Sequence, residues 1–356
     1  INKEDFVAIV EPGVNTALRQ AECEKLGMFY PPDPASGKAT SVGGNVITCA
    51  GGLRAVKYGV TRDYVLGVEA VLPGGQLMKF GGRTHKDVIG LDLGRLFVGS
   101  EGSLGIVTKL ILKLLPKPEA SASVLVGYPS LDAALASMGK VFAAGILPCA
   151  VEFMNETVLE ILTKTGEVPW PDSVKSLLLF QVDGSKDTVP LENARLARQL
   201  DDALWRMEGV GKEEEDKLWA YRRRVSAASY VLGPDRIGGD MAVPRGSILK
   251  AVRKFEEIAA SNGKRLIAFA AAQYRRKRLC PVVKIAFDSV RYIAIVGWHL
   301  KQHISHQTPA FTVFKKLKYR LCKRLYPRTL ASLVIMSKTK NMLVKMPMNL
   351  HYRRNK

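Results

Sequence analysis

The chain has 356 residues, of which 47% are hydrophobic and 24% charged, a composition typical of a globular protein with two or three domains. Its net charge of +20 comes almost entirely from residues 269–356, where 20 Lys and Arg residues stand against the single acid Asp288, so residues 1–268 are close to neutral. No apolar run approaches the roughly 18 residues that span a bilayer, which excludes a membrane-spanning helix, and no secretory signal opens the chain.

Two further features bear on the cellular setting. The five cysteines form neither a CxxC pair nor a zinc-binding spacing, and such a scattered set is typical of free thiols in a reducing compartment. We therefore expect a cytoplasmic protein, with peripheral attachment to a membrane left open by the basic segment. The chain also starts without Met and directly in an apolar strand pattern, which indicates a start inside a longer protein.

Residues 1–117 are predicted to form strands joined by tight turns. Fifteen of the 31 glycines lie between Gly43 and Gly105, and glycine is needed where a chain turns sharply or a ligand lies against the backbone. Strands are expected over residues 6–10, 64–72, 77–80 and 105–115, the second and third joined as a hairpin across Pro73-Gly74-Gly75.

Residues 118–268 are predicted to form an α+β domain, because strand patterns alternate there with amphipathic helix patterns. Strands are expected over residues 121–127 and 177–182. Helices are expected over residues 131–144, 151–164, 191–207 and 249–260, the last ended by Asn262-Gly263.

The basic tail, residues 269–356, has weak periodicity and admits two interpretations. It is either an arm that binds RNA, DNA or anionic lipid, or the product of a shifted reading frame or a wrongly joined exon. We favour the second, so a nucleic-acid partner is not expected. His299, His303 and His306 would share one face of a helix, but no acid lies nearby to orient them, so we predict no metal site.

Glycine-containing strings recur in order along the first third of the chain. They are Pro32-Asp33-Pro34, Ser41-Val42-Gly43-Gly44-Asn45, Ala50-Gly51-Gly52, Lys57-Tyr58-Gly59 and Gly99-Ser100-Glu101-Gly102-Ser103-Leu104-Gly105-Ile106-Val107-Thr108. Paired glycines leave backbone N–H groups open to an anion or to a planar polar ring, and a flavin needs such donors at its pyrimidine edge. Each pair alone is equally the pattern of an ordinary tight turn.

The ordered set resembles the FAD-linked oxidases of the vanillyl-alcohol oxidase type, and within them the glycolate oxidase and D-lactate dehydrogenase group. The resemblance runs from about Val7 to Phe269. It implies the C-terminal part of an FAD-binding domain (1–117), a substrate or cap domain (118–268) and an irregular basic tail. It also implies FAD as the cofactor, held by a shell that includes Pro32, Ser41, Gly43, Gly44, Asn45, Gly51, Gly52, Tyr58, Glu101, Gly102, Ile106 and Val107.

The activity implied by this resemblance is oxidation of a small 2-hydroxy acid, of the D-lactate or glycolate class, by hydride transfer to the flavin. Such a substrate carries a carboxylate, for which a guanidinium is a suitable clamp. The run Trp219–Arg224 resembles the family segment that supplies this arginine, and Arg222 is the best match. The alternative for this run is a solvated basic helix face.

The chain departs from the family pattern at three places. The family's glycine-rich pyrophosphate loop lies upstream of Ile1, and Cys49 stands where relatives often carry a polar residue. The family's metal-binding and catalytic histidines lie in a Gly-His-x-Gly-Asp-Gly-Asn-x-His stretch, where this chain reads Ala270-Ala271-Ala272-Gln273-Tyr274-Arg275-Arg276. We therefore name no catalytic histidine, and the activity of this chain stays open.

Two other functions remain open on the sequence. One is a flavin-fold binding protein whose basic tail contacts nucleic acid or acidic membrane. The other is a different reaction on the same fold, such as that of a sugar-nucleotide reductase or an aryl-alcohol oxidase. The hydroxy acid, the electron acceptor and the oligomeric state are not specified by any motif.

Overall fold

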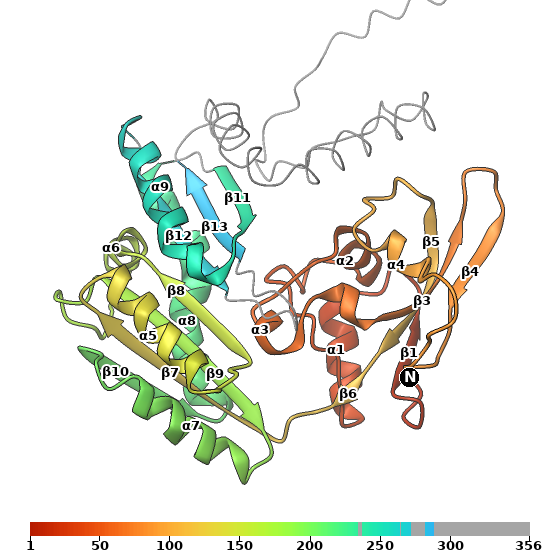
Figure 1. Ribbon diagram of the computed structural model, residues 1–356, viewed down its shortest axis with the longest axis horizontal. Helices are drawn as coiled ribbons and strands as arrows, with labels where there is room; N and C mark the ends of the chain where they lie inside the picture. The colour runs from red at the N-terminus through yellow and green to blue at the C-terminus, as the bar shows by residue number, and fades with distance from the viewer. Residues whose placement is uncertain (234–236, 264, 272–281, 288–356) are drawn as a thin grey trace, which may run out of the picture. The chain divides into compact units, whose positions relative to one another are not determined.

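The computed structural model describes residues 1–233, 237–263, 265–271 and 282–287 (Figure 1). Strands within these ranges form a sheet of four strands, a sheet of seven strands, and a short pair of β2 (Met28–Phe29) with β6 (Leu115–Pro116). Helices accompany the strands throughout, which confirms the predicted α+β class. The predicted basic tail is described only over residues 269–271 and 282–287.

The four-stranded sheet contains the hairpin predicted from Pro73-Gly74-Gly75. Its strand order is β1-β5-β3-β4, and neighbouring strands are antiparallel. The strands are β1 (Val7–Val10), β3 (Val65–Val71), β4 (Leu77–Gly81) and β5 (Ile106–Lys113). All four confirm the strands expected from the sequence. Apolar side chains of β3 and β5 alternate into a buried core, as expected for strands with one face turned inward.

Short helices complete this first region. They are α1 (Thr16–Lys25), α2 (Val42–Thr48), α3 (Ala55–Tyr58) and α4 (Gly94–Phe97), with a 3₁₀ turn at Thr61–Tyr64. The side chain of Asn15 accepts from the Leu18 N–H and that of Ser41 from the Gly44 N–H, so each occupies a helix N-cap. The Ser41–Asn45 string, whose glycine pair is also the pattern of a tight turn, is therefore the start of helix α2.

The seven-stranded sheet has the order β10-β7-β9-β8-β12-β13-β11, again antiparallel. Its strands β7 (Ala120–Tyr128) and β9 (Ser176–Gly184) confirm two expected from the sequence. The others are β8 (Ala150–Met154), β10 (Trp205–Val210), β11 (Ile237–Ala242), β12 (Ile267–Ala271) and β13 (Val282–Phe287).

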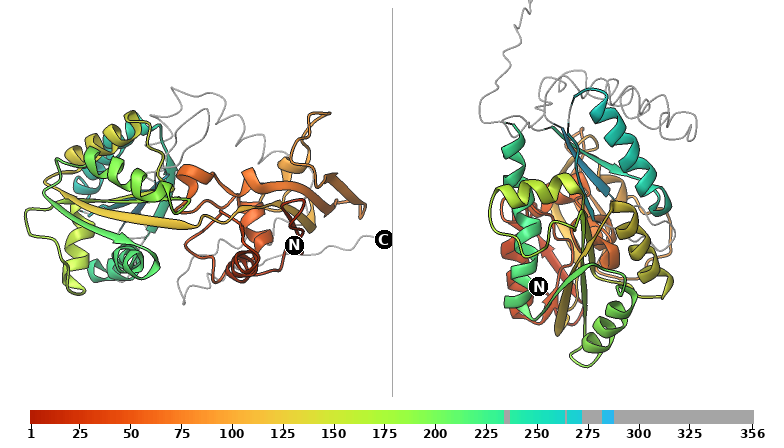
Figure 2. Two further views of the ribbon diagram at one scale, coloured as in Figure 1. Left: turned by 90° about the horizontal axis from the view of Figure 1, so that it is seen from below. Right: turned by 90° about the vertical axis from the view of Figure 1, so that its left-hand side faces the viewer.

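Helices cover both faces of this sheet (Figure 2). On one face lie α5 (Leu131–Ala143), α7 (Thr188–Gln199) and α9 (Ile248–Ala260). On the other lie α6 (Glu156–Lys164) and α8 (Lys212–Ala228), with 3₁₀ turns at Ser229–Leu232 and Arg245–Ser247. Strands covered on both faces need apolar residues on both sides, which is why every residue of Ala150–Met154 is buried.

Two predicted helices are partly wrong. The helix expected over residues 151–164 begins only at Glu156, because Ala150–Met154 form a central strand. The helix expected over residues 191–207 runs from Thr188 to Gln199, and Trp205 begins β10. Both errors arise because a short apolar run has no period that separates a buried strand from a helix.

Asn155 joins three elements of this sheet. Its side-chain oxygen accepts from the N–H of Val158, in the first turn of α6, at 3.3 Å and from the N–H of Ala268, in β12, at 3.2 Å. Its amide nitrogen donates to the Leu266 carbonyl at 3.2 Å. One buried amide therefore caps a helix and fixes the strand beside it.

Candidate functional site

Helix α2 and the Gly99–Gly105 segment lie side by side, which brings two of the predicted cofactor-binding strings together. The N–H groups of Gly99 and Glu101 donate to the carbonyl oxygens of Val46 and Ile47 at 3.0 and 2.9 Å. These carbonyls belong to the last turn of α2, where helix carbonyls run short of partners within the helix; that of Val46 also accepts from the Cys49 N–H at 3.0 Å. The segment therefore caps α2 and is held in register with it.

The first turn of α2 is fixed by close contacts. A Cβ on Gly43 would stand 2.3 Å from the Cβ of Pro12, so no larger residue fits without moving the backbone. The amide of Asn45 is buried and donates to the Thr16 hydroxyl at 2.7 Å. Gly43 and Asn45 thus hold α2 against its neighbours, and their contact with a cofactor stays a prediction.

The turn at Glu101 and Gly102 exposes a strip of backbone. Both residues are left-handed, with φ of 54° and 75°, and no atom lies within 4 Å of the place where a Cβ on Gly102 would stand. Beside them, the hydroxyl of Ser100 is buried and has no hydrogen-bond partner among the described residues. Such a hydroxyl costs about 1–3 kcal/mol, which a ligand with a polar atom at this point would relieve.

The Pro32-Asp33-Pro34 string contacts the second glycine pair. A Cβ on Gly52 would stand 2.2 Å from the Asp33 carbonyl oxygen, so the two strings pack backbone to backbone. The carbonyl of Pro32 accepts from the Gln20 side chain at 2.9 Å. Burial raises the pKa of Asp33, an effect that the nearby Arg54 partly offsets.

The remaining members of the predicted shell differ in exposure. Val107 is 8% exposed and belongs to the core of the four-stranded sheet, whereas its neighbour Ile106 is 72% exposed. Ser41 caps α2, and the N–H of Gly44 donates to its hydroxyl at 3.1 Å. Cofactor contacts by these four residues and by Gly51 stay predictions.

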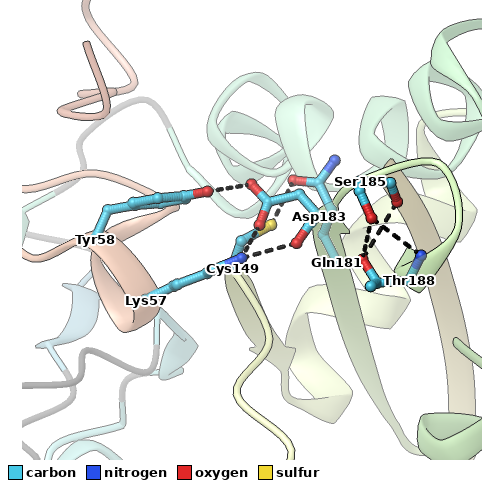
Figure 3. A network of polar contacts seen from close by, with 7 residues as sticks. All are labelled: Lys57, Tyr58, Cys149, Gln181, Asp183, Ser185 and Thr188. Carbon is cyan, nitrogen blue, oxygen red and sulfur yellow. Dashed lines mark hydrogen bonds and ion pairs between the residues drawn. The ribbon is translucent and has the colours of Figure 1, made fainter. Parts of the chain in front are cut away.

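The side chain of Tyr58 contacts the seven-stranded sheet. Its hydroxyl donates to one carboxylate oxygen of Asp183, at the end of β9, at 2.8 Å, and Lys57 donates to the other at 2.5 Å (Figure 3). Lys57 also donates to the Asp183 carbonyl at 2.8 Å. Burial, and then the adjacent carboxylate, raise the pKa of Tyr58 well above its ordinary value, so its phenol stays a donor.

Arg222 is the one arginine of its run that turns toward the sheet. Its side chain is 13% exposed, and its Nε donates to Glu152 in β8 at 2.5 Å. Its guanidinium carbon lies 4.4 Å from the ring centroid of Phe269. By contrast, Arg223 is 56% exposed and pairs with Asp216 on the surface. The alternative of a solvated basic face therefore describes Arg223 and not Arg222.

Glu152 is a functional candidate that sequence reasoning missed. It is fully buried in a strand whose other residues are apolar. One of its oxygens accepts from Arg222, and the other has no partner among the described residues. Holding a guanidinium through Nε leaves its two terminal nitrogens for a second, bidentate acceptor. The signal in the sequence is an acid inside an apolar strand, since buried acids are rare unless paired.

A second buried carboxylate, Glu215, lies two turns earlier on α8. It is 4% exposed and accepts from the hydroxyls of Ser121 and Ser123 and from the amide of Gln181. The indole N–H of Trp219 donates to Ser123 at 3.1 Å. Three neutral donors therefore satisfy one buried charge and fix α8 on the sheet.

Some predictions concern residues outside this description. Most of the basic tail lies outside the described residues, and so do His299, His303, His306, Cys280 and Cys322. Within the described ranges, no group of three or more His, Cys, Asp or Glu side chains is arranged to hold a metal ion. Nor does that part of the chain contain a helix both long and apolar enough to cross a bilayer.

Family comparisons bear on this arrangement. A model described as "FAD linked oxidases, C-terminal domain" matches residues 117–324, more than half of the chain, and an FAD binding domain model matches residues 1–81. The chain belongs to the FAD-linked oxidase family. This confirms the resemblance inferred from the glycine strings. The match to residues 117–324 extends past residue 268, and the origin of residues 269–356 stays a prediction.

Within the family, this FAD-linked oxidase is similar to curated glycolate oxidase and D-lactate dehydrogenase proteins. It is 42% identical over 262 residues to the glycolate oxidase subunit GlcD of Bacillus subtilis, covering 73% of this chain and 56% of that protein. It is 40% identical over 192 residues to a D-lactate dehydrogenase of Anaerostipes hadrus, covering 52% of this chain and 40% of that protein. The chain thus spans about half the length of the curated relatives it matches.

Solved structures show the same fold. Alkyldihydroxyacetonephosphate synthase superposes with a TM-score of 0.67 at 18% identity, covering 92% of this chain and 64% of that one. The 4-ethylphenol oxidase from Gulosibacter chungangensis superposes with a TM-score of 0.62 at 16% identity, covering 81% and 63%. At these identities the likeness concerns the fold alone, and it agrees with the predicted vanillyl-alcohol oxidase type.

The first region of this FAD-linked oxidase fits FAD, the cofactor of its family. The backbone at Gly102 has open space beside it, and the Ser100 hydroxyl, which has no partner among the described residues, could donate to a ligand there. The Gly99–Gly105 segment and α2 are the elements that would hold the cofactor, since hydrogen bonds from the Gly99 and Glu101 N–H groups to the end of α2 place the two glycine strings side by side. FAD supplies a hydride acceptor when it is bound.

Proposed function

We propose that this chain carries the flavin-contacting and substrate-clamping parts of an FAD-dependent dehydrogenase or oxidase for small 2-hydroxy acids. The observation that carries the proposal is the buried Arg222, whose Nε is held by Glu152. The names of the relatives, a glycolate oxidase component and a D-lactate dehydrogenase, agree with such a substrate. D-lactate and glycolate are therefore the first substrates to test.

Arg222 is suited to a carboxylate because of how it is held. Glu152 occupies the Nε side of the guanidinium, and Phe269 covers one face of its plane. The two terminal nitrogens remain for the substrate carboxylate, in the paired geometry that arginine provides and lysine lacks. With its carboxylate clamped, the hydroxyl carbon of the substrate is held in one orientation, which is the chief requirement for hydride transfer.

Glu152 acts on the clamp in two ways. It fixes the guanidinium plane, and it balances the buried positive charge of Arg222 when no substrate is bound. Its second oxygen accepts from no described residue. We assign Glu152 a positioning role and name no proton acceptor, because the stretch in which the family carries its histidines contains none in this chain, from Ala270 to Arg276.

The test is anaerobic reduction of the FAD-loaded chain by D-lactate and by glycolate, followed by bleaching of the flavin absorbance. We expect bleaching by at least one of the two acids. Arg222→Lys keeps the charge but loses the paired donors, and we expect the apparent second-order rate constant to fall by roughly 30-fold or more, the equivalent of about 2 kcal/mol. Arg223→Lys, on the exposed neighbour, is the matched control and should change it less than twofold.

The same experiment decides between the alternatives. A chain that binds FAD but is bleached only by an aryl alcohol or a sugar nucleotide would refute the hydroxy-acid proposal and leave the flavin fold standing. Equal effects of Arg222→Lys and Arg223→Lys would refute the clamp. A chain that takes up no FAD would refute the proposed function as a whole.

A further inference from the structure

The carboxylate of Asp183, in β9, accepts hydrogen bonds from two side chains of α3, which lies in the first region of the chain. Asp183 lies at the end of β9, in the seven-stranded sheet, whereas Lys57 and Tyr58 end the short helix α3, which follows the Gly51-Gly52 pair (Figure 3). The two donors take one carboxylate oxygen each, at 2.5 and 2.8 Å. The Asp183 carboxylate therefore bonds β9 to α3.

The contact is stronger than an ordinary surface ion pair. The side chain of Asp183 is 7% exposed and that of Lys57 is 29% exposed. In the pair of Lys140 with Asp202, within the second region, the corresponding values are 50% for the lysine and 39% for the aspartate. Solvent and salt screen the exposed pair far more than the buried one. A third bond, from Lys57 to the Asp183 carbonyl, adds to the difference.

Two side chains, Gln181 and Glu215, lie between Asp183 and the substrate clamp, and one hydrogen bond joins them. Gln181 lies two residues earlier on the same face of β9, and its amide donates to Glu215 at 2.6 Å. Its oxygen accepts from the thiol of Cys149 at 3.4 Å, so both ends of the amide are committed. Glu215 and Arg222 lie seven residues apart on α8, which places them on one face of that helix.

We propose that Asp183 is a positioning residue that sets the distance between the flavin-contacting segment and the Arg222 clamp, acting on one side through Lys57 and Tyr58 and on the other through the Gln181–Glu215 bond. The inference rests on the proposed function, because it assigns the flavin to one region and the substrate carboxylate to the other. It adds a residue that is assigned no contact with the flavin or with the substrate carboxylate. Hydride transfer is sensitive to such spacing, and a misplacement of about 1 Å can reduce a rate roughly 100-fold.

The first arm of the test needs no cofactor. Hydrogen–deuterium exchange is measured on the full chain without FAD, for wild type, Asp183→Asn and Asp183→Ala. Asp183→Ala removes both acceptors, and we expect faster exchange in Ala55–Tyr58 as well as in Ser176–Gly184. Asp183→Asn retains one acceptor, so its exchange rates should lie between those of wild type and Asp183→Ala. Asp202→Asn, which weakens an ion pair inside one region, should leave exchange in Ala55–Tyr58 unchanged.

The second arm measures flavin reduction by D-lactate and glycolate in the FAD-loaded variants. We expect Asp183→Ala to lower the limiting reduction rate by roughly 10- to 100-fold while the half-saturating substrate concentration changes less than threefold, because the clamp itself is intact. Asp183→Asn should recover part of the rate. Lys57→Met, which leaves Asp183 in place, provides the same test should Asp183→Ala fail to fold.

The outcomes separate the two proposals. Two results would overturn the positioning role. One is unchanged exchange in Ala55–Tyr58 in every Asp183 variant. The other is an unchanged limiting reduction rate with a raised half-saturating substrate concentration. If wild type takes up FAD but neither acid reduces it, the proposed function fails, and the exchange arm still decides whether Asp183 joins the two regions.

Discussion

Replacing Glu215 tests how much a buried carboxylate contributes when neutral groups alone surround it. Glu215→Ala removes an acceptor used by Ser121, Ser123 and Gln181 and leaves the buried Ser123 hydroxyl and two half-buried donors without this partner. Each hydrogen bond to a charged group contributes about 1.5–3 kcal/mol, and each donor left unpaired costs about 1–3 kcal/mol. Because Glu215 is only 4% exposed, solvent does little to reduce these values. Water admitted to the vacated space would satisfy some donors, so we expect a net loss of about 3–5 kcal/mol.

The measurement is the free energy of unfolding from urea titration, with Glu213→Ala as the control on the same helix. Glu213 is 89% exposed and pairs with Lys217, so its loss should cost no more than about 0.5 kcal/mol. Glu215→Gln keeps the shape but sets an amide N–H₂ against three donors, and we expect an intermediate loss. A loss below about 1 kcal/mol for Glu215→Ala would refute the reasoning, since it would mean that the carboxylate contributes no more than an exposed one.

Further predictions concern the glycines and a buried phenol. Gly43→Ala should destabilise the chain by about 1–3 kcal/mol, because the new Cβ would stand 2.3 Å from the Cβ of Pro12. Gly139→Ala should stabilise it by about 0.5–1 kcal/mol, because Gly139 lies inside α5 and no atom lies within 4 Å of the new Cβ. Thermal melting compares the two variants. Burial raises the pKa of Tyr30 from 10.0 to about 12, so the stability that its neutral phenol contributes is complete below pH 10 and is lost as the pH rises toward 12. Urea titrations over this range should show a smaller decline for Tyr30→Phe than for wild type, and parallel declines would contradict the assignment.

Most strands of residues 1–117 could be predicted from the sequence, because the signals for them are local. The hairpin β3–β4 follows from apolar runs on either side of Pro73-Gly74-Gly75, and its register follows from the turn. The glycine strings predicted a shell around a cofactor, which stays a prediction, and the structure places two of them side by side through the contacts of Gly99 and Glu101 with α2. Local spacing did not show that the Ser41–Asn45 string is helical, because two glycines in a row disfavour a helix.

The site residues that sequence analysis missed depend on contacts between distant positions. Glu152 and Arg222 are 70 residues apart, and Tyr58 and Asp183 are 125 residues apart. The apolar strand around Glu152 indicates a paired acid but does not specify its partner, and an acid near the end of a strand, such as Asp183, is equally suited to solvent. The burial of β8 also hid its strand character, since an apolar run covered on both faces does not alternate.

The three contacts of Asn155 have a consequence for synthesis on the ribosome. Strand β8 has one neighbour, β9, that follows it closely in the chain, and another, β12, that emerges more than 100 residues later. Until residues 266–268 leave the exit tunnel, the edge of β8 is open and the side chain of Asn155 lacks two of its partners. An open apolar strand edge is a site of aggregation, so a nascent chain that stalls in this interval needs a chaperone to cover it.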